Sequence, residues 1–161
     1  MDNFLKKIDE VLNELISSGD RILVGVSGGA DSIALLHVLN KFSFAKNYTL
    51  VIAHVNYMAR GEDSFEDAQF VKDVSIKLGL PFFSKEINVG EERLRFKKNF
   101  QEFARSVRYK FFEDTLKIIG GDKIAVAHSA DDQVETILMN FIRGSGLTGL
   151  AGIPQVRGKI I

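Results

Sequence analysis

The most informative segment of the sequence is ILVGVSGGADSIALLHVL, residues 22–39. It begins with a short apolar run rich in β-branched residues, which is typical of a buried strand, and it ends with the apolar residues of a helix. Between the two, SGGADS (residues 27–32) places two glycines and two serines in one turn. Glycines let a backbone approach an anion closely, and the unpaired amides at a helix start bind phosphate oxygens. The stretch therefore predicts a strand, a phosphate-binding turn and a helix.

The same turn also satisfies G-x-S-x-G at residues 25–29, the pattern of a hydrolase nucleophile elbow. In that alternative Ser27 attacks the substrate and His128 is the base. The elbow of such hydrolases follows several strands, whereas this turn follows the first predicted strand, so we favour phosphate binding. The turn lacks the lysine of a Walker A loop. Asp31 would repel bare phosphates, and its presence indicates a bridging Mg²⁺.

Apolar periodicity predicts the remaining elements. The expected strands are residues 21–27, 49–57, 81–89 and 122–129, with a further strand starting in 156–161, and the expected helices are residues 3–17, 30–40, 64–78, 100–119 and 131–143. Ser64 is expected to cap its helix, and Phe70, Val71 and Val74 are expected on the buried face. This alternation predicts an α/β fold with a doubly wound, mostly parallel sheet and helices on both faces. Ligands of such sheets bind at the carboxyl ends of the strands.

Composition narrows the class of protein. A chain of 161 residues is most simply one domain, with a net charge of zero. No apolar run is long enough to span a membrane, and the amphipathic N-terminal segment is not a signal peptide, so we expect a cytoplasmic protein with no membrane partner. The absence of cysteine excludes disulfides, cysteine-ligated metal clusters and any mechanism that uses a protein thiol or persulfide.

SGGADS after the first strand resembles the loop of the PP-loop ATP pyrophosphatases, whose fold is that of the adenine nucleotide alpha hydrolases. These enzymes cleave ATP to AMP and pyrophosphate while they adenylate a carbonyl-type oxygen. Three further stretches are similar to the N-terminal domain of the tRNA(Ile)-lysidine synthase family: HVNYMARGEDSFEDAQFV, ARSVRYKFFE and AHSADDQVETILMNFIRGSGLTGLAGIP. The resemblance covers about residues 20–154. Tyr57 stands where many members have a second histidine, and Thr148 where many have arginine. Thiolating relatives that need cysteine are excluded.

The resemblance implies a reaction. ATP adenylates the C2 oxygen of the wobble cytidine in a tRNA(Ile) with a CAU anticodon, and the ε-amine of free L-lysine then displaces AMP to leave lysidine. ATP and Mg²⁺ are the implied cofactors, and because family members are often dimers, a homodimer is a further implied partner. The family carries C-terminal tRNA-binding domains, so residues 1–161 are expected to be a PP-loop ATP pyrophosphatase domain cut short at its C-terminal edge. The residues leave open two alternatives, another PP-loop adenylating ligase with a small-molecule acceptor and a non-catalytic ATP-binding module.

The nucleotide contacts follow from matching the family's loop residue by residue. The resemblance assigns the ATP phosphates to Ser27, Gly28, Gly29, Ala30, Asp31 and Ser32. It also places the adenine against backbone atoms of Ala53 and His54, at the end of the second strand. A plain structural histidine at the strand end is the alternative for His54.

Three acids follow the fourth predicted strand, and a histidine lies near the end of that strand. Asp131 and Asp132 begin a helix, where acids serve as caps, but a pair beside Glu135 indicates that at least one faces a cation. We expect Asp132 and Asp31 to hold Mg²⁺, which screens the triphosphate and the leaving pyrophosphate. Alternatively, an acid here binds the ammonium of lysine and removes its proton, so Asp131 and Glu135 are expected at the substrate. His128 is expected to act as a general base or to stack on a base, with a structural role as the alternative.

Basic residues gather between residues 91 and 110, where seven basic residues face three acidic ones. We expect Arg105 and Arg108 to contact the RNA backbone, and the alternative is a solvated helix face. Arg60 and Arg143 are further candidates for phosphate or RNA contact. GSGLTG, residues 144–149, matches G-x-G-x-x-G but follows a predicted helix rather than a strand, so we reject it as a dinucleotide motif.

Overall fold

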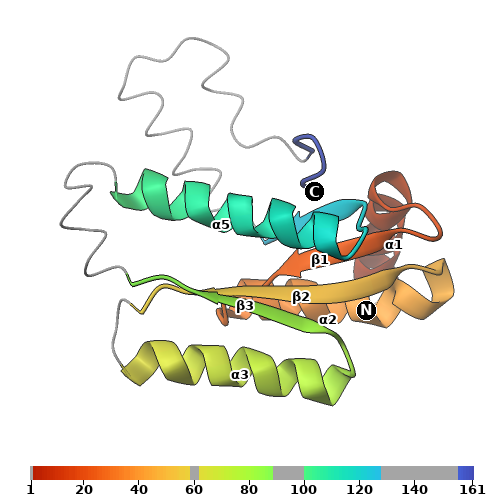
Figure 1. Cartoon of the computed structure of the whole chain (residues 1–161). Coiled ribbons are helices and arrows are strands. Elements are labelled where there is room, and N and C mark those ends of the chain that lie inside the picture. The colour runs from red at the N-terminus through yellow and green to blue at the C-terminus, as the bar shows by residue number, and fades with distance from the viewer. Residues whose placement is uncertain (1, 59–61, 89–99, 128–155) are drawn as a thin grey trace, which may run out of the picture.

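The protein is built on one parallel sheet. The computed structural model describes residues 2–58, 62–88, 100–127 and 156–161. The four strands are β1 (Arg21–Gly25), β2 (Thr49–Asn56), β3 (Phe82–Glu86) and β4 (Lys123–Val126). They run parallel in the order β3-β2-β1-β4 (Figure 1). Because β2 and β3 lie on one side of β1 and β4 lies on the other, the direction of winding reverses between β1 and β4. This is the switch point at which sheets of this kind bind ligands.

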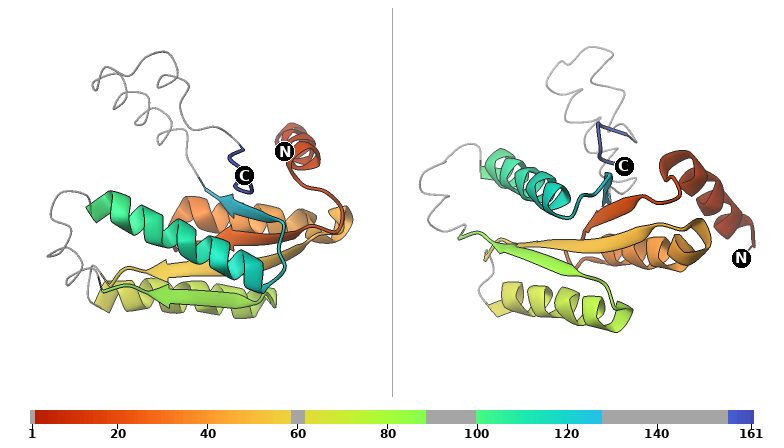
Figure 2. Two further views of the ribbon diagram at one scale, coloured as in Figure 1. Left: turned by 45° about the horizontal axis from the view of Figure 1, so that its top comes forward. Right: turned by 45° about the vertical axis from the view of Figure 1, so that its right-hand side comes forward.

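Helices cover both faces of the sheet, as predicted. They are α1 (Asp2–Leu15), α2 (Ala30–Lys46), α3 (Glu62–Leu78) and α5 (Phe100–Ile118). Buried side chains of α1, α2 and α3 form one core with the sheet, and those of α5 form a second core on the other face. Figures 1 and 2 show α5 on the face of the sheet opposite to α2 and α3. Among the described residues, no helix is long and apolar enough to cross a membrane.

β2 shows why the sheet is buried on both faces. Every residue of β2 after Thr49 is buried. Successive side chains of a strand point to opposite faces, so Leu50 and Ile52 belong to the first core and Val51 and Ala53 to the second. The near-continuous apolar sequence of this strand predicted this position.

Three details of the helices differ from the sequence-based expectations. α2 continues to Lys46, six residues beyond its predicted end at residue 40. α3 begins at Glu62, so Ser64 lies inside the helix and the prediction that it caps the helix is wrong. The prediction that Phe70 is buried is also wrong, because 48% of its surface is exposed, whereas Val71 and Val74 are buried. Neighbours on a helix point about 100° apart, so the stripe through Val71 and Val74 turns Phe70 towards solvent.

The C-terminal segment, residues 156–161, lies along the outer edge of β4. The Ile124 amide donates to the Lys159 carbonyl at 2.8 Å, the Ile161 amide to the Ile124 carbonyl at 2.9 Å, and the Val126 amide to the Ile161 carbonyl at 3.2 Å. The segment makes an isolated parallel bridge between Ile124 and Ile160, and a second bridge between Arg157 and Ile160 closes a turn, so a strand is not formed where one was predicted to start. The predicted helix 131–143 lies outside the described residues.

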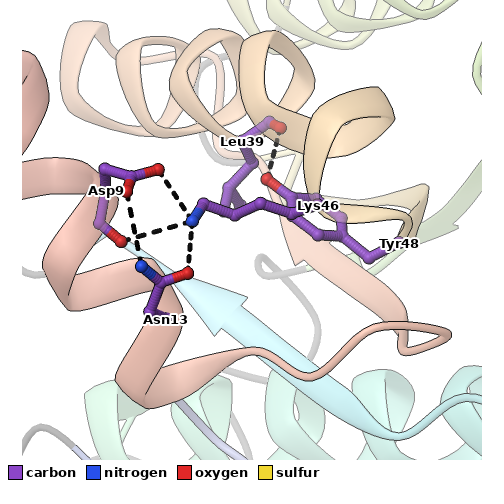
Figure 3. Close-up of polar contacts among 5 residues, drawn as sticks. All are labelled: Asp9, Asn13, Leu39, Lys46 and Tyr48. Carbon is purple, nitrogen blue, oxygen red and sulfur yellow. Dashed lines mark hydrogen bonds and ion pairs between the residues drawn. The ribbon is translucent and has the colours of Figure 1, made fainter.

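α1 is attached to the end of α2 by a half-buried lysine (Figure 3). The ammonium of Lys46 lies 2.7 Å from an Asp9 carboxylate oxygen and donates to the Asn13 side-chain carbonyl. Next to it, the Tyr48 hydroxyl donates to the Leu39 carbonyl at 2.6 Å. Burial raises the pKa of Tyr48 to about 12.

Candidate functional site

The turn SGGADS, residues 27–32, leads from β1 into α2 and leaves the start of the helix open. Gly28 has φ of +97°, a left-handed conformation that favours glycine. Gly29 is the N-cap residue, and no side chain caps the helix. The first bond of α2 runs from the Ile33 amide to the Gly29 carbonyl at 3.1 Å. The amides of the first helical turn therefore remain available to an anion.

Two serine hydroxyls hold the shape of this turn. Ser32, at 5% exposure, donates from Oγ to the Gly29 carbonyl at 2.8 Å and accepts the Ser27 amide at 3.2 Å. The Ser27 Oγ lies 3.1 Å from the Ser32 Oγ and accepts the Gly29 amide at 3.3 Å. His128, the base of the nucleophile-elbow alternative, lies outside the described residues. The uncapped start of α2 favours phosphate binding at this turn.

A cavity of about 290 Å³ opens beside the turn. It lies where β1, β2 and β4 end and α5 begins, which is the predicted edge of the sheet. It is lined by Gly25, Val26, Ser27, Ser32, Val55, Tyr57, Arg105, Arg108, Tyr109, Phe112, Val126 and Ala127. The structure thus brings the two predicted phosphate-binding serines together with the two arginines predicted to contact RNA.

A larger hollow of about 670 Å³ lies at the opposite edge of the sheet. Its lining includes Thr49 and Pro81, at the amino ends of the strands. Ligands of parallel sheets bind at the carboxyl ends, so the smaller cavity at the turn is the candidate site.

Gly25 allows α5 to close over the floor of the cavity. A Cβ atom at this position would lie 2.8 Å from ring atoms of Phe112 and 3.2 Å from a methyl group of Val126. The Phe112 ring of α5 therefore packs against the backbone at the end of β1, in the space that a side chain at position 25 would occupy. Sequence reasoning read Gly25 only as part of a motif, since the requirement comes from a helix more than 80 residues later.

His54 supports the end of β1 from below the turn. Its side chain is 2% exposed, and its Nδ1 lies 2.8 Å from the Val26 carbonyl. A carbonyl can only accept, so Nδ1 carries the proton in this bond. His54 lies on the face of β2 covered by α2 and α3, whereas the cavity faces α5. The neighbouring Ala53 carbonyl accepts the Val26 amide at 2.9 Å. Contact of these residues with adenine stays a prediction.

α5 contributes arginines and a tyrosine to the cavity. The Arg105 and Arg108 guanidinium carbons lie 5.1 and 5.4 Å from the Tyr109 ring centroid. The Tyr57 hydroxyl donates to the Ala104 carbonyl at 3.2 Å and links the end of β2 to α5. Burial raises the pKa of the Tyr57 phenol, and the Arg108 charge partly offsets this rise.

Sequence reasoning missed Tyr109, which lines the cavity, and Arg157, which lies against the Tyr109 ring. Arg157 comes from the C-terminal segment, and its guanidinium carbon lies 5.2 Å from the Tyr109 ring centroid. No local signal marks Arg157, because its neighbours in the cluster are about 50 residues away in the chain. The Tyr109 ring could have been found from its position beside Arg108.

Six predicted site residues lie outside the described residues: Arg60, His128, Asp131, Asp132, Glu135 and Arg143. Asp31 is described and lies exposed in the first turn of α2. Within the described parts of the chain, no group of three histidine or acidic side chains could hold a metal ion.

Known proteins resemble this chain in sequence and in fold. The PP-loop domain family model matches residues 1–160. A tRNA(Ile)-lysidine synthase of Caldanaerobacter subterraneus subsp. tengcongensis is 46% identical over 147 residues, which are 91% of this chain and 32% of that protein. A tRNA(Ile)-lysidine synthase of Clostridium tetani is 41% identical over 158 residues, covering 95% of this chain and 34% of that protein. This chain thus spans about a third of the length of these relatives.

Among solved structures, the U34-tRNA thiolase NcsA from Methanococcus maripaludis, with its [4Fe-4S] cluster, has a similar fold. The TM-score is 0.78 at 20% sequence identity, and the match covers 91% of this chain and 52% of that chain. At this identity the likeness shows the fold. The family model matches nearly the whole chain, and the uncapped glycine turn has the expected form. The chain therefore belongs to the PP-loop domain family.

Proposed function

We propose that this chain is the ATP-using domain of a tRNA(Ile)-lysidine synthase. In the proposed reaction, ATP adenylates the C2 oxygen of the wobble cytidine in a tRNA(Ile) with a CAU anticodon and pyrophosphate leaves. The ε-amine of free L-lysine then displaces AMP. The observation that carries the proposal is the open glycine turn beside the cavity at the switch point. The similarity to lysidine synthases over more than nine tenths of the chain supports the substrate.

The turn holds the phosphates through hydrogen bonds and forms no covalent bond to them. The amides of Ala30, Asp31 and Ser32 face the N-terminal end of α2, where the helix dipole favours negative charge. Gly28 and Gly29 leave room for the anion to approach this backbone. The Ser32 hydroxyl keeps the turn in shape through its bond to the Gly29 carbonyl, and the Ser27 hydroxyl donates to a phosphate oxygen after a small rotation.

Asp31 suits a magnesium ion that the phosphates would share. Mg²⁺ is usually bound by one or two carboxylates together with phosphate oxygens and water. Asp31 is exposed and starts the same helix turn as the phosphate-binding amides. When bound, the ion would screen the charge of the triphosphate. Asp132 is proposed as its second ligand or as the group that binds the lysine ammonium, and His128 as a general base.

A chimaera tests this function. The 147-residue segment of the Caldanaerobacter relative that matches this chain is replaced by this chain, and incorporation of radiolabelled lysine into a tRNA(Ile) transcript with a CAU anticodon is measured. We expect incorporation that depends on ATP and releases AMP and pyrophosphate. A Ser32→Ala variant should lose most ATP affinity and lysine incorporation, because three hydrogen bonds of the turn depend on its hydroxyl.

Three outcomes would contradict the proposal. Intact ATP binding without lysine incorporation, in a chimaera that folds, would exclude the lysidine reaction. Pyrophosphate release that ignores RNA and follows a small-molecule acceptor would favour another adenylating ligase. A covalent adduct trapped on the Ser27 side chain would show that Ser27 is a nucleophile, as in the nucleophile-elbow alternative. Sedimentation of the same chimaera tests the predicted homodimer.

A further inference from the structure

Three arginines surround one aromatic ring beside the cavity. Arg105 and Arg108 come from α5, and Arg157 comes from the C-terminal segment that lies along β4. Their guanidinium carbons lie 5.1, 5.4 and 5.2 Å from the Tyr109 ring centroid. The Tyr109 ring is itself held in the core, edge-to-face with Phe112. We call these three side chains the arginine cluster.

The arginine cluster has no acidic partner among the residues that the structure describes. The ion pairs in this part of the chain join Lys46 to Asp9, Lys110 to Asp114 and Lys123 to Asp20. Attraction to the face of a tyrosine offsets only part of the repulsion between like charges. In addition, the Nε of Arg108 is buried with no hydrogen-bond acceptor. Buried donors normally have partners, so the cluster is arranged for an anion.

The position of the cluster selects the kind of anion. Arg108 is half-buried and lines the cavity with Ser27 and Ser32, whereas Arg105 and Arg157 are exposed. The glycine turn already supplies amides for the phosphates of ATP at the start of α2. The cluster lies on another helix and extends from the cavity to the surface. A ligand that follows it must carry phosphates both inside and outside the cavity.

We propose that the arginine cluster binds phosphodiester groups of the RNA strand that enters the cavity. Arg157 of the C-terminal segment contributes as much to RNA affinity as Arg105 does. This inference rests on the proposed function, because it assigns the RNA to the same cavity. Arg108 holds the phosphate nearest to the reacting base. Arg105 and Arg157 hold the strand outside the cavity. The C-terminal segment thereby becomes part of the substrate site.

The test compares matched variants of the whole chain. Binding of a 17-nucleotide RNA hairpin with a CAU anticodon loop is measured between 50 and 200 mM KCl, for the unsubstituted chain and for Arg105→Gln, Arg157→Gln and the double variant. Lys110→Gln is the control, because Lys110 lies on the same helix but pairs with Asp114. Binding of a fluorescent ATP analogue is measured in parallel. Thermal unfolding confirms that each variant is folded.

We expect Arg105→Gln and Arg157→Gln each to weaken RNA binding severalfold and to reduce the slope of log K against log salt by about 0.9. The double variant should lose about twice as much slope, and Lys110→Gln should match the unsubstituted chain. ATP affinity should fall much less than RNA affinity in the arginine variants and should be unchanged in Lys110→Gln.

Several results would overturn this inference. One is unchanged RNA affinity in the double variant, and another is the absence of RNA binding by the unsubstituted chain at 50 mM KCl. A loss of ATP affinity as large as the loss of RNA affinity would assign the arginine cluster to the nucleotide instead. The proposed function fails separately, through loss of ATP binding or of lysine incorporation in the chimaera, so the two failures are distinguishable.

Discussion

At the scale of single residues, two glycines near the site are required for different reasons. Gly25 is required by space, because a Cβ there would lie 2.8 Å from the Phe112 ring. Gly28 is required by its backbone, with φ of +97°, while a Cβ there would meet Asp67 and Val71 only at 3.6 Å, an ordinary contact distance. Glycine is therefore needed at position 25 because a side chain would clash, and at position 28 because the backbone is left-handed.

Gly25→Ala should destabilise the protein by about 1–3 kcal/mol through overpacking. Phe112→Leu in the same chain should recover part of this loss, because it removes the ring atoms that the new methyl group meets. Gly28→Ala should cost about 1–2 kcal/mol through the left-handed backbone, and Phe112→Leu should not relieve it. Urea denaturation of the two double-mutant cycles measures both couplings. Equal coupling of Phe112→Leu to both glycine substitutions would contradict the steric explanation.

At the scale of elements, polar side chains at the surface join α1 to the end of α2, beside the apolar core that the two helices share. Lys46 crosses from α2 to the Asp9 and Asn13 side chains of α1, and Tyr48 reaches back to the Leu39 carbonyl (Figure 3). α2 ends in the same place, since Asn47 has a left-handed conformation and the Tyr48 amide donates to the Ser43 carbonyl. The end of one helix thus fixes the position of another.

Tyr48 should make the protein sensitive to alkaline pH. Burial raises its pKa in the folded state from 10.0 to about 12, so the unfolded chain loses the phenolic proton first. The contribution to the free energy of unfolding is complete below pH 10 and is lost progressively between pH 10 and about 12. Tyr48→Phe should cost about 1 kcal/mol at pH 8, through the lost hydrogen bond to Leu39.

Urea denaturation at pH 8, 10 and 11 checks this prediction. The free energy of unfolding of the unsubstituted chain should fall more steeply above pH 10 than that of Tyr48→Phe, because other titrating groups are common to both. Parallel curves for the two proteins would show that the Tyr48 phenol is accessible to water in the folded state.

At the scale of the whole molecule, the sheet joins segments from both ends of the chain at one site. β1 carries the glycine turn, β4 ends beside it, and residues 156–161 bind to the outer edge of β4. This arrangement brings Arg157 to Tyr109 of α5. The C-terminal segment therefore both protects an edge strand and completes the arginine cluster.

Deletion of residues 156–161 should expose the outer edge of β4. The Ile124 and Val126 amides would lose their acceptors, the carbonyls of Lys159 and Ile161. Hydrogen exchange should therefore accelerate at these two amides, while the Val26 amide, bonded to the Ala53 carbonyl, serves as the internal control. Equal protection of Ile124 and Val126 with and without the segment would show that it does not pair with β4.

Sequence patterns predicted the order of the described strands and helices, the extent of α5 and the open glycine turn, because these features depend on signals between near neighbours. Apolar periodicity distinguishes a strand from a helix over a few residues, and glycines mark turns. The strand order β3-β2-β1-β4, the outward direction of Phe70 and the meeting of Arg105, Arg108 and Arg157 around Tyr109 could be seen in the three-dimensional structure alone. These depend on which surfaces pack together across many residues of chain, and no local pattern records that choice.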